Sequence, residues 1–246
     1  MKPYPTGRAL ILGGSCELAI GVAMVMVEKG LHPIVTYRSD RGRARIDESL
    51  QHAGGRYTGL PLDLSKRASF TPLRQELDQG MDYLVDFAHG ELEGLVASAD
   101  KRAVVSYFET NIANRAEVLQ QVSRIMTAQR NGRMVYVSSA AAQRPNPGQG
   151  YYAAAKRACE ALYRNVGLEL AARGVTTVTL RPGYIDAGRG LRYLEKKADH
   201  ALDKVPLARA LGINEVVDTI MFLLSDSAVG FNATELTMDG GLTSGK

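Results

Sequence analysis

The chain has 246 residues, of which 45% are hydrophobic and 23% are charged, and its formal net charge is +4 at pH 7. This length and balance are typical of one large globular domain. The mild, scattered positive charge excludes a nucleic-acid-binding footprint. Two cysteines and four histidines lie without ligand spacing, so we expect neither a disulfide framework nor a metal site.

Membrane association is not expected from the sequence. Residues 1–7 lack the apolar core of a signal peptide, and the longest apolar run, residues 18–27, is too short to span a bilayer. We therefore expect a cytoplasmic protein that has neither a membrane nor a nucleic acid as its partner.

The first elements predict a phosphate-binding turn. Residues 8–12 form an apolar strand pattern, followed by Gly13, Gly14 and Ser15 and by an almost wholly apolar helix pattern over residues 18–29. A strand, a glycine turn and a helix together place backbone N–H groups and a helix N-terminus around a phosphate. A tight turn without any ligand would produce the same pattern.

The second predicted strand, residues 32–37, ends in polar side chains. In a dinucleotide-binding fold, the group that holds the adenosine ribose lies at about this distance beyond the glycines. Tyr37, Arg38 and Ser39 occupy the position here. An arginine and a hydroxyl suit a ribose 2′-phosphate, which favours NADPH over NADH. Asp40 has an alternative role as the cap of the next helix.

Strands and helices then alternate to the end of the chain. We predict strands over residues 57–62, 81–88, 134–137, 175–180 and 233–238, and helices over residues 65–79, 99–130 (one or two helices), 152–173 and 214–224. Asp63, at the end of the third strand, is placed to contact an adenine. A polar segment over residues 187–205 is predicted to be a mobile lid. The near-continuous apolar strands favour a parallel sheet covered on both faces. The predicted fold class is α/β, a single-domain Rossmann-type doubly wound parallel sheet of about seven strands over residues 1–246.

A serine, a tyrosine and a lysine carry the candidate chemistry. Ser139 follows the strand over residues 134–137, and Tyr152 and Lys156 lie four apart at the start of a helix pattern, so they share one face. A free tyrosine has a pKa of about 10, and a nearby ammonium favours its phenolate form. A serine hydroxyl can stabilise an oxygen on which charge develops. These groups suit proton exchange with a carbonyl or alcohol oxygen, although a surface tyrosine and a solvated lysine can have the same spacing.

Over essentially its whole length, the chain resembles the short-chain dehydrogenase/reductases, most nearly the 3-oxoacyl-carrier-protein reductase type. The order and spacing of Asn111, Ser139, Tyr152 and Lys156 carry the resemblance, together with the segments 205–209 and 222–241. The resemblance implies that Tyr152 is the proton donor or acceptor and that Ser139 orients and stabilises the substrate oxygen. It also implies that Lys156 lowers the tyrosine pKa and holds the nicotinamide ribose, and that Asn111 helps to keep a water that links Lys156 to solvent.

The expected site is therefore as follows. The predicted catalytic residues are Asn111, Ser139, Tyr152 and Lys156. The predicted cofactor-binding residues are Gly13, Gly14, Ser15, Leu18, Tyr37, Arg38, Ser39, Asp63, Leu64, Ala88, Tyr152, Lys156, Pro182, Gly183 and Ile185. The resemblance further implies a small carbonyl substrate, possibly linked to a carrier, and a homodimer or homotetramer.

Several positions depart from the family pattern. The first turn keeps the leading glycine, Gly13, but Glu17 places a carboxylate close to the expected pyrophosphate, unless its side chain turns away or caps the helix. Residues 86–89 read Asp-Phe-Ala-His where two asparagines, an alanine and a glycine are usual. His89 is either a catalytic group near the nicotinamide or a histidine that satisfies backbone at the strand end. Ala187 replaces a threonine and removes a carboxamide contact.

Two classes of function remain open. The first is NADPH-dependent reduction of a ketone to an alcohol, or the reverse alcohol dehydrogenase reaction. The second is a catalytically weak dinucleotide-binding or regulatory protein on the same fold, suggested by the altered glycine turn. The Tyr152–Lys156 spacing disfavours an enoyl reductase.

Basic residues outnumber acidic ones in the predicted lid. This surplus suits an acidic carrier or substrate, but it would also suit a loop that is merely solvated. The basic residues are Arg189, Arg192, Lys196, Lys197 and Lys204.

Overall fold

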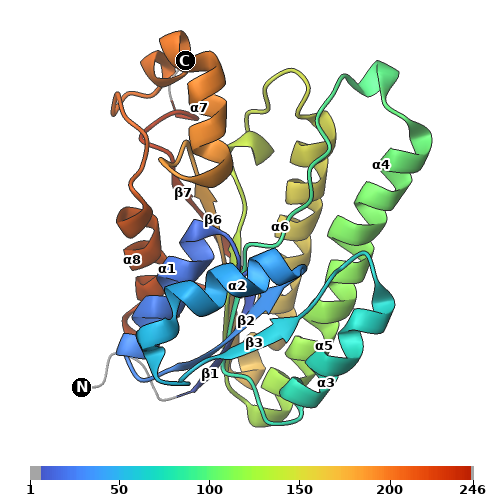
Figure 1. Ribbon diagram of the computed structural model, residues 1–246, viewed down its shortest axis with the longest axis vertical. Coiled ribbons are helices and arrows are strands. Elements are labelled where there is room, and N and C mark those ends of the chain that lie inside the picture. The colour runs from blue at the N-terminus through green and yellow to red at the C-terminus, as the bar shows by residue number, and fades with distance from the viewer. Residues whose placement is uncertain (1–6, 245–246) are drawn as a thin grey trace.

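A seven-stranded parallel sheet forms the centre of the protein (Figure 1). The computed structural model describes residues 7–244, without the side chains of residues 189 and 196–200. The strands are β1 (Arg8–Leu12), β2 (His32–Tyr37), β3 (Thr58–Pro61), β4 (Tyr83–Asp86), β5 (Gly132–Val137), β6 (Val175–Pro182) and β7 (Thr234–Met238). Their order is β3-β2-β1-β4-β5-β6-β7, and every pairing is parallel. The predicted single-domain, doubly wound fold is confirmed.

Helices cover both faces of this sheet, as Figure 1 shows. They are α1 (Glu17–Glu28), α2 (Asp40–Ser49), α3 (Phe70–Leu77), α4 (Lys101–Phe108), α5 (Asn114–Gln129), α6 (Gly150–Leu170), α7 (Gly188–Ala201) and α8 (Ile213–Leu224). Helices α1, α2 and α8 contribute to the core on one face, and α3, α5 and α6 to the core on the other. No helix within residues 7–244 combines the length and the apolar character needed to cross a bilayer.

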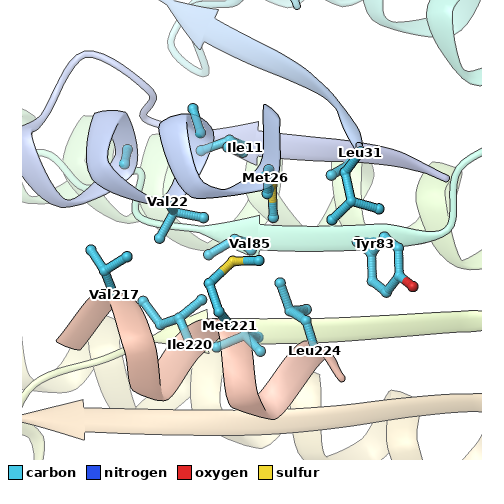
Figure 2. Close-up of a cluster of buried hydrophobic side chains, with 14 of the residues drawn as sticks. Ile11, Val22, Met26, Leu31, Tyr83, Val85, Val217, Ile220, Met221 and Leu224 are labelled. Carbon is cyan, nitrogen blue, oxygen red and sulfur yellow. The ribbon is translucent and has the colours of Figure 1, made fainter. Parts of the chain in front are cut away.

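The apolar side chains of β1 alternate between these two cores. Ala9 and Ile11 belong to the cluster with α1 and α8, whereas Leu10 and Leu12 belong to the cluster with α3, α5 and α6. This alternation follows from the two-residue repeat of a strand. In Figure 2, side chains from α1 and α8 meet over Val85 of β4. Fully burying one such aliphatic side chain contributes about 1.5–3 kcal/mol to stability.

The structure adds detail to three of the sequence predictions. The stretch over residues 99–130, predicted as one or two helices, consists of two, α4 and α5, joined by the π-helical turn Glu109–Ala113. Ser39 rather than Asp40 caps α2, since its Oγ accepts the backbone N–H of Gly42 at 3.2 Å. The segment predicted as a mobile lid contains α7, in which Leu194 and Ala201 are buried. Its many polar residues hid this amphipathic pattern.

Candidate active site

Apart from Tyr152 and Lys156, which lie on α6, the predicted cofactor residues lie at or just beyond the carboxyl ends of strands. Gly13, Gly14, Ser15 and Leu18 lie beyond β1, Tyr37 to Ser39 at the end of β2, Asp63 and Leu64 beyond β3, Ala88 beyond β4, and Pro182, Gly183 and Ile185 at the end of β6. In a parallel sheet these ends share one edge. After β1 the chain continues through β2 on one side of β1, and it later crosses to β4 on the other side, so the strand order reverses at β1. Ligands of doubly wound folds bind beyond the carboxyl ends of the strands at such a reversal.

The first turn is packed so closely that only glycine fits it. Gly13 has a positive φ of 72°, and a Cβ there would lie 2.7 Å from the backbone N of Ala88. A Cβ at Gly14 would lie 2.2 Å from a side-chain carbon of Val35. The backbone N–H of Gly14 donates to Thr36 O at 2.9 Å, which fixes the turn against β2. The two glycines therefore let α1 begin directly at the edge of the sheet.

The beginning of α1 fits a phosphate group in one respect and opposes it in another. The N-cap residue, Cys16, makes no side-chain capping bond, and the first N–H groups of a helix are those that can bind an anion. Glu17, however, places a carboxylate at the same point. Its Oε1 accepts Arg45 Nη2 at 2.9 Å and its Oε2 accepts the backbone N–H of Gly188 at 3.0 Å. The side chain thus turns toward α2 and α7 instead of capping its own helix.

The end of β2 presents a cation to solvent. Arg38 and Ser39 are exposed, whereas Tyr37 is half-buried. Within the described part of the chain, no carboxylate pairs with Arg38, which leaves its guanidinium available to an anion. These groups and the glycine turn fit a dinucleotide that carries a ribose 2′-phosphate.

At the next strand end, Asp63 and Leu64 are held in place by neighbouring residues. Asp63 Oδ1 accepts the backbone N–H of Ser65 at 3.0 Å and its hydroxyl at 2.7 Å. The side-chain amide of Asn114 donates to Leu64 O at 2.7 Å. At the end of β6, the backbone N–H of Gly183 donates to Met238 O at 2.9 Å, and a Cβ at Gly183 would lie 2.8 Å from Asp239 Cα. These loops are therefore fixed relative to the sheet.

Tyr152 and Lys156 lie on the same side of α6, as their spacing predicted. Lys156 is only 3% exposed, and its Nζ donates to Val137 O at 2.8 Å, which ties it to the end of β5. This Nζ lies 5.9 Å from the centroid of the Tyr152 ring. Ser139 follows two residues beyond Val137, and its Oγ accepts the backbone N–H of Ala141 at 3.1 Å. A hydroxyl that accepts a hydrogen bond can still donate its own proton.

A buried ionic cluster fixes α6 to the sheet, and sequence reasoning missed it. Glu160 Oε1 accepts Ser138 Oγ at 2.6 Å and Arg181 Nε at 2.7 Å, and its Oε2 accepts Arg181 Nη2 at 2.7 Å. Burial acts to raise the pKa of Glu160, but the hydrogen bonds from Arg181 and Ser138 outweigh it and hold the pKa below its ordinary value. Glu160 lies four residues beyond Lys156, so helical spacing is the signal that could have found it.

A second buried network occupies the space beneath the end of β4. Arg115 pairs with Asp86 and donates to Ala88 O, and Tyr163 Oη donates to Asp86 Oδ2 at 2.8 Å. Arg115 and Asp86 are completely buried. Burial opposes the charge on Arg115, but the adjacent carboxylate outweighs that effect and raises its pKa further. Asp86, where the family pattern has asparagine, therefore anchors an ion pair that links β4 to α5 and α6.

Asn111 lies in the π-helical turn and holds the loop beyond β4. Its Oδ1 accepts the backbone N–H of Gly90 at 2.7 Å, and its Nδ2 donates to Tyr107 O at 2.8 Å. Its backbone carbonyl accepts Arg115 Nε at 2.9 Å and the thiol of Cys159 at 3.2 Å. Rare π-helical turns occur frequently at functional sites. The water that Asn111 is expected to hold stays a prediction.

His89 contacts two tyrosines. Its Nε2 lies 2.6 Å from Tyr107 Oη, and its ring lies edge-on to the ring of Tyr152, with centroids 4.7 Å apart and an interplanar angle of 87°. The structure thus brings His89, Tyr152 and Lys156 together at the ends of β4 and β5. Among the residues that the structure describes, no three His, Cys, Asp or Glu side chains gather where they could hold a metal ion.

Comparisons with known proteins identify the family of the chain. A family model described as enoyl-(acyl carrier protein) reductase matches residues 16–243. The chain belongs to the short-chain dehydrogenase/reductase family of oxidoreductases. The resemblance seen in the sequence is therefore confirmed.

Individual relatives resemble the chain over almost their whole length. A protein of Escherichia coli (strain K12), described as 3-oxoacyl-acyl-carrier-protein reductase FabG, is 27% identical over 238 residues, or 95% of this chain and 96% of that protein. The protein of the same description from Staphylococcus epidermidis (strain ATCC 35984) is 24% identical over 95% of this chain and 98% of its own.

Two solved structures share the fold. One is described as a short chain dehydrogenase/reductase family protein and has a TM-score of 0.87 and 24% identity, covering 99% of this chain and 100% of its own. The other, provisionally described as a betaketoacyl-ACP reductase, has a TM-score of 0.86 and 25% identity, covering 97% of this chain and 98% of its own.

Proposed function

We propose that this protein reduces a ketone to an alcohol with NADPH and that Tyr152 is the proton donor. The observation that carries the proposal is the buried Lys156, whose ammonium is held beside the ring of Tyr152 by the carbonyl at the end of β5. A cation at that position stabilises the phenolate that remains once the proton has left. The names of the relatives, which are ketoacyl reductases, support the same reaction.

The chain's own residues supply proton transfer, orientation and charge. When bound, the nicotinamide supplies hydride to the carbonyl carbon. Tyr152 Oη gives its proton to the carbonyl oxygen as negative charge develops there, so the C=O double bond becomes a C–O single bond with a new C–H bond at carbon and a new O–H bond at oxygen. Ser139 Oγ–H donates a hydrogen bond to the same oxygen and orients it. Lys156 keeps its proton and stabilises the resulting phenolate.

The choice of NADPH rests on the end of β2. Arg38, with Ser39 beside it, would hold the 2′-phosphate, while the glycine turn, Asp63 and Ala88 would hold the rest of the dinucleotide. Arg38 is exposed, and no carboxylate among the described side chains pairs with it, which supports this choice. The reverse reaction uses the same groups, with Tyr152 as the proton acceptor.

The substrate is proposed to enter beneath a lid over residues 187–205, of which α7 forms the larger part. The carrier-linked substrates named for the relatives, together with the basic residues of this segment, make a 3-oxoacyl thioester the first substrate to test. The expected homodimer or homotetramer can be checked by analytical ultracentrifugation.

The alternative, a dinucleotide-binding protein with weak catalysis, is favoured by one observation, the Glu17 carboxylate at the phosphate turn. A titration with NADPH and NADH, followed by turnover of a panel of 3-oxoacyl thioesters and simple ketones, distinguishes the two. We expect tighter binding of NADPH and measurable turnover. Binding without turnover of any ketone would overturn the reductase proposal in favour of the alternative.

A further inference from the structure

We propose that His89 is a positioning residue that holds the phenol of Tyr152 in its reactive orientation, and that Tyr107 and Asn111 in turn hold His89. This inference deepens the proposed function and rests on it, because it assigns Tyr152 as the proton donor. It adds a residue at a position where the family pattern has a glycine, which has no side chain to contribute.

The contact between His89 and Tyr152 is specific in geometry. The two rings meet at 87° with centroids 4.7 Å apart, so the edge of one ring faces the flat surface of the other. Aromatic rings prefer this arrangement over face-to-face stacking because their edges are positive and their faces negative. Tyr152 is the third residue of α6, and a side chain in a first helical turn has little preceding helix to pack against. His89 supplies such a packing surface from the loop beyond β4.

Tyr107 holds the imidazole of His89. Tyr107 Oη lies 2.6 Å from His89 Nε2, and the two rings also meet edge to face at 83°. Tyr107 is buried, so its hydroxyl is most stable when this hydrogen bond is kept. The bond therefore restrains rotation of the His89 side chain.

Asn111 fixes the backbone next to His89 and the backbone of Tyr107. Its side-chain amide accepts the backbone N–H of Gly90, next to His89, and donates to the backbone carbonyl of Tyr107. Asn111 is 2% exposed, so both bonds are shielded from water. A Cβ at Gly90 would lie 3.0 Å from Asn111 Nδ2, which explains why the loop approaches so closely at a glycine. The loop that carries His89 is thus fixed to α4 and the π-helical turn.

Disrupting these contacts should lower the rate of turnover more than it weakens the binding of NADPH. A misplacement of about 1 Å in a reacting group can cost about 100-fold in rate without changing affinity. His89→Ala is expected to lower kcat for a 3-oxoacyl thioester by about 10-fold or more, with the Kd for NADPH within about threefold of the parent value. His52→Ala, at an exposed histidine of the turn Gln51–Ala53, is the matched control and should leave both unchanged.

Two further variants distinguish a positioning role of His89 from a general disruption of the structure. His89→Phe keeps a ring against Tyr152 and should retain more kcat than His89→Ala. Tyr107→Phe removes only one hydroxyl; it should lower kcat severalfold alone and have little further effect in the His89→Ala background, because the two residues act in series. Additive losses, or an unchanged kcat in His89→Ala, would overturn the proposal.

A measurement without substrate keeps the inference separate from the proposed function. In protein carrying ¹³C-labelled tyrosine, the Tyr152 resonance is assigned as the one missing from Tyr152→Phe. His89→Ala and Tyr107→Phe should both shift it, and His52→Ala should not. If the parent protein reduces no ketone yet the resonance moves as stated, the reductase proposal fails while the contact stands. An unmoved resonance refutes the positioning role.

Discussion

The carboxylate of Glu17 accepts the backbone N–H of Gly188 at 3.0 Å, across 171 residues of sequence. The other oxygen of the same group pairs with Arg45. One side chain at the predicted phosphate-binding turn therefore joins the start of α1 to α2 and to the first residue of α7. If the proposed cofactor binds here, its pyrophosphate would lie close to this carboxylate and be repelled by it, so we expect the contact and the cofactor to compete.

The competition predicts the effect of Glu17→Gln. Removing the charge while keeping the shape should tighten NADPH binding by about fivefold at low salt, or about 1 kcal/mol, and the gain should shrink at 0.5 M salt. Fluorescence titration of NADPH measures it, with Glu28→Gln at the other end of α1 as the control. Weaker binding in Glu17→Gln would instead mean that the carboxylate assists the cofactor.

Tyr152→Phe should abolish measurable turnover and leave NADPH binding within about twofold, because only the transferable proton is lost. The neighbouring Tyr151→Phe removes a hydroxyl that donates to Val96 O, and it serves as the matched control. Stopped-flow turnover and a binding titration on both variants check this. An active Tyr152→Phe enzyme would reassign the proton donor.

Arg38→Ala should weaken NADPH binding by about 10–100-fold and NADH binding by less than about twofold. A charge-assisted hydrogen bond to a phosphate is worth about 1.5–3 kcal/mol, and NADH lacks that phosphate. Arg41→Ala, an exposed residue on α2, removes the same charge without reaching the end of β2. Equal losses for both cofactors in Arg38→Ala would contradict a 2′-phosphate contact.

The buried Asp86–Arg115 pair predicts a large change in stability. Arg115→Met should lower the free energy of unfolding by about 3–5 kcal/mol, because it leaves an unpaired carboxylate in the core. The double variant Asp86→Leu with Arg115→Met should lose less than Arg115→Met alone. Urea unfolding monitored by circular dichroism tests both, and a double variant that is less stable than the single one would contradict the explanation.

Glu160 predicts a pH dependence of stability. Its folded-state pKa lies below the ordinary value of 4.5, so folded protein binds this proton less readily than unfolded protein. The stabilisation is therefore present above about pH 4.5 and is lost as the pH falls through the lower, folded-state value. Glu160→Gln should have a lower Tm at pH 7, and the difference from the parent should narrow toward pH 3. A constant difference from pH 7 to pH 3 would count against this.

The sequence carried enough local signal to place the sheet edge and the Tyr152–Lys156 pair. Apolar runs marked most of the strands, and four-residue spacing put both side chains on one face of α6. The partners Asp86, Arg115 and Tyr163 could not be found in this way. They come from three elements that meet only once the sheet is assembled, and no periodicity connects them. The helical character of α7 was hidden by its polar residues.

The π-helical turn Glu109–Ala113 has one more consequence. The backbone N–H of Asn114 donates to Glu109 O, five residues back, so the helix holds an extra residue between α4 and α5. Each residue turns an α-helix by about 100°. Deleting one residue from this turn would rotate Tyr107 about the helix axis relative to Arg115. The aromatic contacts of Tyr107 would then be separated from the buried ion pair of Arg115. Chain length through this turn is therefore as much a requirement of the site as the identity of any side chain in it.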